Sequence, residues 1–394
     1  MSEDLYGTAG DEGRMSYPMQ TDREAFDIPV GVAYLNCANM APRLKSVSVA
    51  GHGAVDTLAA PWSIAAGDWF AGSAALRRLF AGLIGAREDS VALVPSVSYG
   101  VAVAARNIPL RDGDNIVVLD REYPSNYYSW ARAARQSGAR IRVATAPTGT
   151  SLTEAVLALI DRTTAVVAVP HCRWTDGAFV DIVRIGEAAR KHGAALVIDA
   201  SQSLGACPLD VSECKPDFLA TVGYKWLLGP YGLGYLYVDE RWHADGVPVE
   251  ESWLHRDGSD NFATLADYTD AYAAGAGRFN QGESPQFYLQ PMAIAALSQV
   301  SQWRPARIQQ RLREWTDALC ERAGAIGFSF PAERVGHMVG LRSPHGLPDG
   351  LVERLRGEGI HVAVRGDSIR VSPHLHTTEQ DLSRLLNALR TRTT

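Results

Sequence analysis

Cysteine is scarce in this sequence: the chain has five, an odd number, and none shows C-x-x-C spacing. Such scattered cysteines favour reduced thiols, with neither a disulfide framework nor a zinc site. An excess of positive charge is also missing, because 38 basic residues face 44 acidic ones for a net charge of −6. Nucleic acid and anionic membrane surfaces are therefore not expected partners.

Long apolar runs are absent as well. The longest ones are broken by charge or glycine well before they reach the length of a membrane span. Residues 1–5 are acidic and lack the basic region followed by an apolar one that marks a secretory signal. We therefore expect a cytoplasmic protein that does not span a membrane and holds no metal.

What the chain does have is length and an ordinary globular composition. Its 394 residues are 46% hydrophobic and 21% charged, which favours two ordered domains. We expect a polar tail over residues 1–25 and an N-terminal segment over 26–44 that packs with the smaller domain. Residues 45–289 then form the large ligand-binding domain, and 290–394 form a small α+β domain.

Short apolar runs recur along the large domain and are typical of buried strands. They alternate with amphipathic helical stretches such as 152–160 and 182–191. This alternation predicts an α/β fold with a mostly parallel, seven-stranded sheet flanked by helices. The seven runs are 91–94, 116–119, 141–144, 165–169, 195–198, 218–222 and 234–238.

The C-terminal part has a different texture. One long helical run is expected at about 290–325, with its apolar residues at helical spacing. A strand, a helix, a strand and a helix are expected after it, at 337–342, 351–357, 369–372 and 378–390.

Two charged residues stand at the ends of neighbouring strands. Asp199 follows one apolar run, and Lys225 follows the next, between Tyr224 and Trp226. The carboxyl ends of parallel strands share the edge where open sheets bind ligands. Alone, the lysine fits a strand cap and the aspartate a helix N-cap. Together with Gln202 they point to a pyridoxal phosphate (PLP) site, since a carboxylate keeps the pyridine nitrogen protonated and a desolvated lysine is a nucleophilic amine.

The stretch 195–234 resembles the fold-type I PLP enzymes of the class V aminotransferase group. That group includes cysteine desulfurases, kynureninases, isopenicillin N epimerase-like proteins and several C–S lyases, and the resemblance runs from about residue 30 to the C-terminus. It implies that Lys225 is the Schiff-base lysine, Asp199 the partner of the pyridine nitrogen and Gln202 the partner of the phenolate oxygen.

The same resemblance assigns further cofactor contacts. Val97 and Ser98 open a helix after a strand, where backbone N–H groups and a hydroxyl cradle a phosphate. Tyr123 stands where an aromatic ring stacks on the cofactor. Tyr224 resembles the kynureninase tyrosine that reaches the phosphate, whereas Val222 stands where a phosphate-binding serine is common.

A loop from a neighbouring subunit is expected to complete the site. Gly282, Glu283 and Ser284 resemble the family segment that crosses to the partner's phosphate, so we expect a homodimer. Glu283 would repel a phosphate dianion, so the backbone N–H or Ser284 must serve there instead.

Three residues are candidates for contact with a small amino-acid substrate. Arg370 resembles the arginine that binds the α-carboxylate in a bidentate fork. Trp174 stands where desulfurases carry a polar asparagine, and it either forms a bulky wall of the pocket or packs against the sheet. Asn39 is expected to line the pocket. The aromatic loop 253–272 either lines the pocket, which favours a bulky or apolar substrate, or serves a dimer interface.

The predicted PLP site indicates the first chemical step of the reaction better than its product. Transamination, β-elimination at a C–S or C–N bond, and racemisation all begin with abstraction of the Cα proton by Lys225. Desulfurases need a mobile cysteine near 359–368, and none lies there. We expect an aminotransferase or β-eliminating lyase and not a cysteine desulfurase. The alternatives are an epimerase-like racemase and a PLP-binding protein without turnover.

Overall fold

The protein is described from a computed structural model that covers residues 22–147 and 150–390. Of the polar tail predicted at 1–25, residues 1–21 lie outside the described part. The central sheet has seven strands in the order β2-β8-β7-β6-β5-β3-β4, and β8 runs in the direction opposite to the other six. The strands are β2 (Val91–Val94), β3 (Asn115–Leu119), β4 (Arg140–Ala144), β5 (Thr164–Pro170), β6 (Ala195–Asp199), β7 (Phe218–Val222) and β8 (Gly234–Val238).

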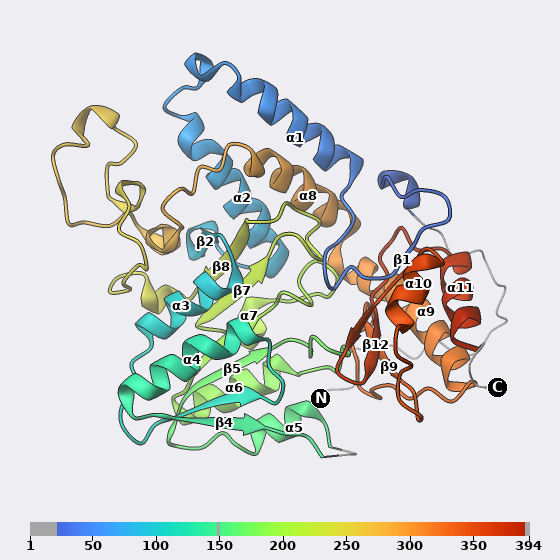
Figure 1. Cartoon of the computed structure of the whole chain (residues 1–394). Coiled ribbons are helices and arrows are strands. Elements are labelled where there is room, and N and C mark those ends of the chain that lie inside the picture. The colour runs from blue at the N-terminus through green and yellow to red at the C-terminus, as the bar shows by residue number, and fades with distance from the viewer. Residues whose placement is uncertain (1–21, 148–149, 391–394) are drawn as a thin grey trace.

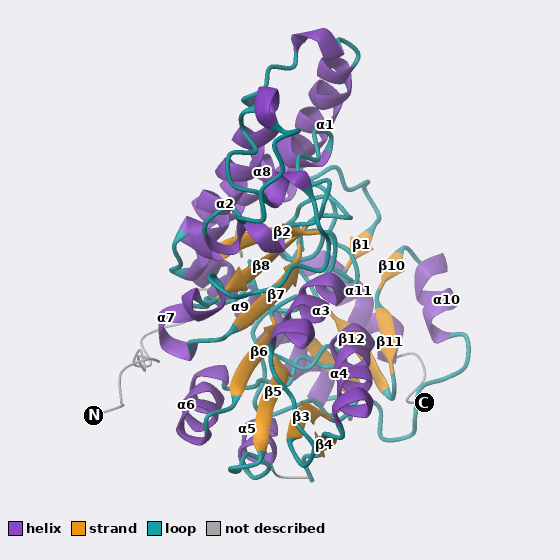
Figure 2. Ribbon diagram, turned by 90° about the vertical axis from the view of Figure 1, so that its left-hand side faces the viewer, coloured by secondary structure: helices purple, strands orange, loops and turns teal. Residues whose placement is uncertain are grey.

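Helices cover both faces of this sheet (Figure 2). The helices α3 (Val97–Asn107) and α4 (Pro124–Ser137) bury apolar side chains against one face. On the other face pack α2 (Asp68–Ile84), α5 (Leu152–Leu157), α6 (Ile182–His192) and α7 (Val211–Cys214). A strand buried on both faces needs apolar residues at successive positions, which is why these runs are continuous. The predicted mostly parallel α/β fold is confirmed.

The helical run predicted at about 290–325 is two helices, α8 (Leu289–Trp303) and α9 (Pro305–Gly324). They break at Arg304, which adopts a left-handed backbone with φ of 65°. Pro305 lacks an N–H and disfavours helical geometry in the preceding residue, so a continuous helix is interrupted there. Helix α8 packs beside α1 (Lys45–Leu58) and α2 (Figure 1).

The C-terminal lobe, coloured orange to red in Figure 1, has its own small sheet. Its strands are β11 (Ala363–Arg365), β12 (Ser368–Val371) and β9 (Val339–Arg342), paired antiparallel in that order and flanked by α10 (Leu351–Gly357) and α11 (Glu379–Arg390). The N-terminal β1 (Ala33–Tyr34) pairs with β10 (Ile360–His361). Short 3₁₀ helices lie at Arg23–Ala25, Pro61–Ser63, Glu88–Ser90, Glu240–Trp242, Trp253–His255, Phe262–Thr264 and Gly275–Phe279.

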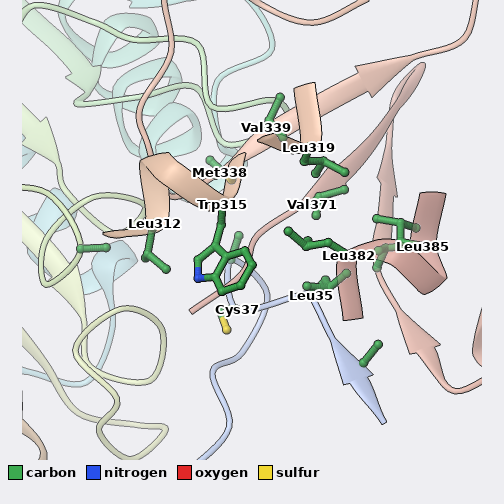
Figure 3. Close-up of a cluster of buried hydrophobic side chains, with 14 of the residues drawn as sticks. Leu35, Cys37, Leu312, Trp315, Leu319, Met338, Val339, Val371, Leu382 and Leu385 are labelled. Atoms are coloured by element: carbon green, nitrogen blue, oxygen red, sulfur yellow. The ribbon is translucent and has the colours of Figure 1, made fainter. Parts of the chain in front are cut away.

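The buried side chains of this lobe come from segments far apart in the sequence (Figure 3). Trp315 of α9 lies among residues of β9, β12 and α11, and Leu35 and Cys37 enter the same cluster from the N-terminal segment. The beginning of the described chain is therefore held against its end. Among the described residues, no helix is both long and apolar enough to cross a bilayer.

Candidate active site

Lys225 lies in the turn that follows β7. The turn is tight: a Cβ on Gly223 would come within 2.7 Å of the Leu233 carbonyl oxygen, so only glycine fits there. The lysine side chain is buried, and its Nζ lies 5.5 Å from the centroid of the Tyr123 ring and 5.8 Å from that of Tyr224. Burial, opposed by the charge of Asp199, lowers the pKa of Lys225 to about 8. The unprotonated share of the amine near neutral pH is therefore larger than that of an exposed lysine, although the protonated form still predominates.

Asp199 ends β6, which pairs with β7 in parallel, so both strand ends meet at one edge of the sheet. Its carboxylate is buried and accepts a hydrogen bond of 2.9 Å from the Ser201 backbone N–H. Burial raises the pKa of Asp199 above the ordinary carboxyl value. A buried carboxylate with so little compensation is suited to a cationic partner.

Next to Lys225 lies a cavity of about 160 Å³, which α3 meets with its N-terminus. Its lining includes four of the predicted site residues, Val97, Ser98, Tyr123 and Tyr224, and also Val222. A much smaller cavity of about 10 Å³ continues on the side of Asp199, and both share Tyr123, Ser201 and Lys225. The predicted phosphate cradle, stacking ring and lysine thus face one space.

Two serines at this helix terminus act together. The Ser96 hydroxyl accepts a hydrogen bond from the Tyr99 N–H at 3.2 Å and lies 2.8 Å from the Ser98 hydroxyl. Sequence reasoning selected Val97 and Ser98 but missed Ser96. Its signal was present, since a serine preceding an apolar helical run is the preferred N-cap.

Gln202 lines the smaller cavity and joins three segments. Its amide nitrogen donates to the Ala38 carbonyl at 3.0 Å, and its side-chain oxygen accepts from the Trp226 indole at 3.2 Å. The His337 Nε2 lies 2.6 Å from the backbone carbonyl oxygen of Gln202. An amide nitrogen carries two hydrogens, so one remains for a ligand.

The three predicted substrate residues lie together, around an arginine that the sequence analysis did not select. Arg370 is buried, and its Nη1 donates to the Trp174 carbonyl at 2.8 Å. The Arg365 guanidinium lies 5.9 Å from the centroid of the Trp174 ring, and its Nη2 is 3.4 Å from the Asn39 side-chain oxygen. Trp174 in turn packs edge-on against Tyr123 at 5.6 Å.

Gly282, Glu283 and Ser284 lie outside the lining of both cavities in their own chain. The Gly282 N–H donates to Glu250, Glu283 is exposed, and Ser284 is buried with its carbonyl accepting from Gln290 at 2.8 Å. Their predicted approach to a partner's phosphate stays a prediction.

The aromatic loop 253–272 does not line the cavities either. Trp253 and Phe262 pack against Trp69, at centroid distances of 5.9 Å each, and Tyr268 is 96% exposed. These rings therefore do not shape the cavities of their own chain, and their effect on substrate choice or on a dimer interface stays a prediction.

Glu122 is a second buried carboxyl at the site that sequence reasoning missed. It lines the smaller cavity with Asp199, and its Oε1 accepts from the Tyr123 N–H at 2.7 Å. Burial, with a further contribution from the charge of Asp199, raises the pKa of Glu122 to about 8. Glu122 therefore holds a proton near neutral pH, whereas the unfolded chain releases it.

This shift predicts a pH-dependent stability. Between the ordinary carboxyl pKa and about 8, the folded state binds more protons at Glu122 than the unfolded state, so stability falls as pH rises through that window. Glu122→Gln removes the effect. We compare the free energy of unfolding of the variant with that of the parent protein. This difference should be roughly 1–3 kcal/mol more favourable to the variant at pH 8.5 than at pH 5.5. Thermal unfolding at both pH values measures it, and an equal difference at both would contradict the assignment.

Several buried polar atoms at the site lack a hydrogen-bond partner within the described part of the chain and are free to contact the polar groups of PLP. Glu122 Oε2, Ser201 Oγ and Arg370 Nε are buried with no hydrogen-bond partner among the described residues. The Lys225 amine makes no ion pair with a described carboxylate. The site thus offers an amine, a strand-end carboxylate and a helix N-terminus to a ligand with an aldehyde, a pyridine nitrogen and a phosphate.

This fold and site define a PLP-dependent enzyme of fold type I. The sequence pattern of the family described as "Aminotransferase class-V" matches residues 66–385, and the chain belongs to that family. Similar proteins are an uncharacterized aminotransferase, YcbU, of Bacillus subtilis (29% identical over 321 residues, 80% of this chain and 83% of that protein) and isopenicillin N epimerase of Streptomyces clavuligerus (28% over 328 residues, 79% and 82%).

Solved structures share the fold at lower identity. A cysteine desulfurase from Thermococcus onnurineus NA1 superposes with a TM-score of 0.82 at 19% identity, covering 95% of this chain and 98% of that one. The cystine C-S lyase C-DES also gives 0.82, at 21% identity, covering 92% and 98%. The family membership makes this chain a PLP-dependent enzyme, which excludes the alternative of a binding protein without turnover.

Proposed function

We propose that this enzyme acts on an α-amino acid, as an aminotransferase or a β-eliminating lyase, and that Lys225 abstracts the Cα proton. The observation that carries this proposal is the buried Lys225 amine, with a pKa of about 8, held beside Tyr123 at the strand edge that also presents Asp199. A general base with its pKa near the working pH is the efficient choice for moving a proton.

Bound PLP supplies an electron sink for the pair of electrons left at the substrate Cα. Asp199 would hold the ring nitrogen in its protonated form, Gln202 would donate to the phenolate oxygen, and Tyr123 would stack on the ring. Ser96, Ser98 and the helix N-terminus would bind the phosphate, with Tyr224 beside them. Arg370 would fix the substrate α-carboxylate, which sets the Cα–H bond relative to Lys225.

The cysteines support the expectation that this is not a desulfurase. Of the five, Cys172 alone lines the cavities beside Lys225, and burial raises its pKa well above the ordinary thiol value. Cys320 lies buried on α9. Neither offers a thiolate nucleophile. The five unpaired thiols also support the proposed cytoplasmic location.

The proposal includes a homodimer whose partner supplies Gly282–Ser284 to the phosphate. It is supported by the position of this loop away from the cavities of its own chain, and by the exposed rings of Trp62 and Tyr268. We also propose the two domains predicted from the sequence, with α8 attached to the larger one because it packs on α1 and α2.

A panel of amino acids, incubated with and without a keto-acid acceptor, tests the reaction. Transamination requires the acceptor, whereas elimination releases keto acid and ammonia without it. Chiral analysis of recovered substrate detects racemisation, the second candidate, which is favoured by the similarity to isopenicillin N epimerase. If no amino acid of the panel is converted or racemised, the proposal is contradicted.

A further inference from the structure

Arg365 and Arg370 project from the same face of a hairpin. Strands β11 and β12 are joined by the two residues Gly366 and Asp367, and Arg365 pairs with Ser368 while Ala363 pairs with Arg370. Side chains two residues apart on a strand share a face, so Arg365 lies diagonally opposite Arg370. Such diagonal neighbours are within reach of long side chains, and one ligand can therefore meet both guanidinium groups.

Trp174, which lines the smaller cavity, contacts both arginines, which lie outside the lining of the two cavities. Its carbonyl accepts the Arg370 hydrogen bond, and its ring lies under the Arg365 guanidinium. The indole itself is held by a 2.8 Å hydrogen bond to the carbonyl of Arg121, whose backbone is left-handed with φ of 55°. A positive φ costs free energy in a residue other than glycine, so the backbone at Arg121 is strained where its carbonyl holds this tryptophan.

Among the residues that the structure describes, no carboxylate pairs with the positive charge of Arg365 and Arg370. Neither Arg365 nor Arg370 is within 4.0 Å of a carboxylate oxygen in the described residues. The charge of Arg365 lowers the pKa values of both Lys225 and Arg370, which are first lowered by burial. The α-carboxylate of a substrate would neutralise one arginine and leave the other uncompensated.

We propose that Arg365 binds a second carboxylate, carried by the substrate side chain, so that the preferred substrate is an amino acid with an acidic side chain. This inference rests on the proposed function and deepens it. Arg370 holds the α-carboxylate at its buried position, while Arg365, half-buried between Trp174 and Asn39, holds the side-chain carboxylate nearer the solvent. Planar guanidinium forks suit carboxylates in both places.

Matched substrates test this inference. The parent enzyme is expected to turn over glutamate or aspartate with a kcat/KM at least about tenfold above that of the corresponding amide, glutamine or asparagine. Arg365→Gln is expected to lower kcat/KM for the acid by about ten- to a hundredfold and to change that of the amide by less than about threefold. Arg356→Gln, an exposed arginine on α10, is the matched control and should change neither.

Binding of unreactive carboxylates gives a second readout. Glutarate and butyrate are titrated into the holoenzyme while tryptophan fluorescence is followed. Arg365→Gln should weaken glutarate about tenfold and leave butyrate unchanged. Equal effects of the variant on both ligands, or a parent enzyme that prefers the amides, would overturn the assignment. An enzyme that binds glutarate through Arg365 but turns over no amino acid would refute the proposed function instead.

Discussion

Replacing Lys225 by alanine is expected to lower kcat on every amino-acid substrate by at least about 10³-fold. The amine is buried beside Tyr123 and Tyr224 and has a pKa of about 8, and alanine leaves no basic group at its position. Steady-state kinetics on the best substrate of the panel measure the loss. Added methylamine should restore part of the rate, because it supplies the missing base without the tether.

Lys191→Ala is the matched control for this variant. Lys191 is exposed in the last turn of α6, away from the cavities, and its removal should leave kcat within about twofold of the parent value. A Lys225→Ala enzyme that kept more than a tenth of the parent rate would show that another group moves the proton.

Asp199→Asn is expected to lower kcat by about 10²–10³-fold while the fold is retained. Asparagine keeps the volume of the side chain and can still accept the Ser201 N–H, but it carries no negative charge to hold a ring nitrogen protonated. Kinetics and cofactor absorbance after gel filtration should together show an enzyme that still retains PLP but turns over slowly.

Asp239→Asn is the matched control, because it makes the same substitution at an aspartate that follows another strand. Asp239 follows β8, which runs antiparallel to β7, so it lies at the opposite edge of the sheet. Its replacement should leave kcat unchanged within about twofold. If Asp199→Asn turned over as fast as the parent enzyme, the Asp199 carboxylate would have no role in holding the ring nitrogen protonated.

The central sheet was predictable because its strands are continuous apolar runs between polar turns. Three of the seven, at 91–94, 218–222 and 234–238, have the predicted bounds, and the other four differ by one residue at one or both ends. Parallel pairing then brings Asp199 and Lys225 to one edge, so their proximity followed from strand order alone. Local pattern and topology were sufficient here.

Other features depend on contacts that a single stretch of sequence does not contain. The break at Arg304 requires a left-handed residue inside an apolar helical pattern, and the pattern concealed it although Pro305 marked the place. Glu122 becomes a protonated acid because distant segments bury it beside Asp199. Arg365 had one local signal, the Gly366-Asp367 turn, which is typical of a two-residue hairpin and predicts a shared face with Arg370.

Exchange of the Cα proton with solvent tests the central claim, which is that Lys225 abstracts that proton. The enzyme is incubated in D₂O with each amino acid of the panel, and the loss of the Cα–H signal is followed by NMR. We predict deuterium at Cα of recovered substrate for the parent enzyme and none above background for Lys225→Ala. Turnover with no deuterium at Cα of the recovered substrate, or exchange that continues in Lys225→Ala, would contradict this claim.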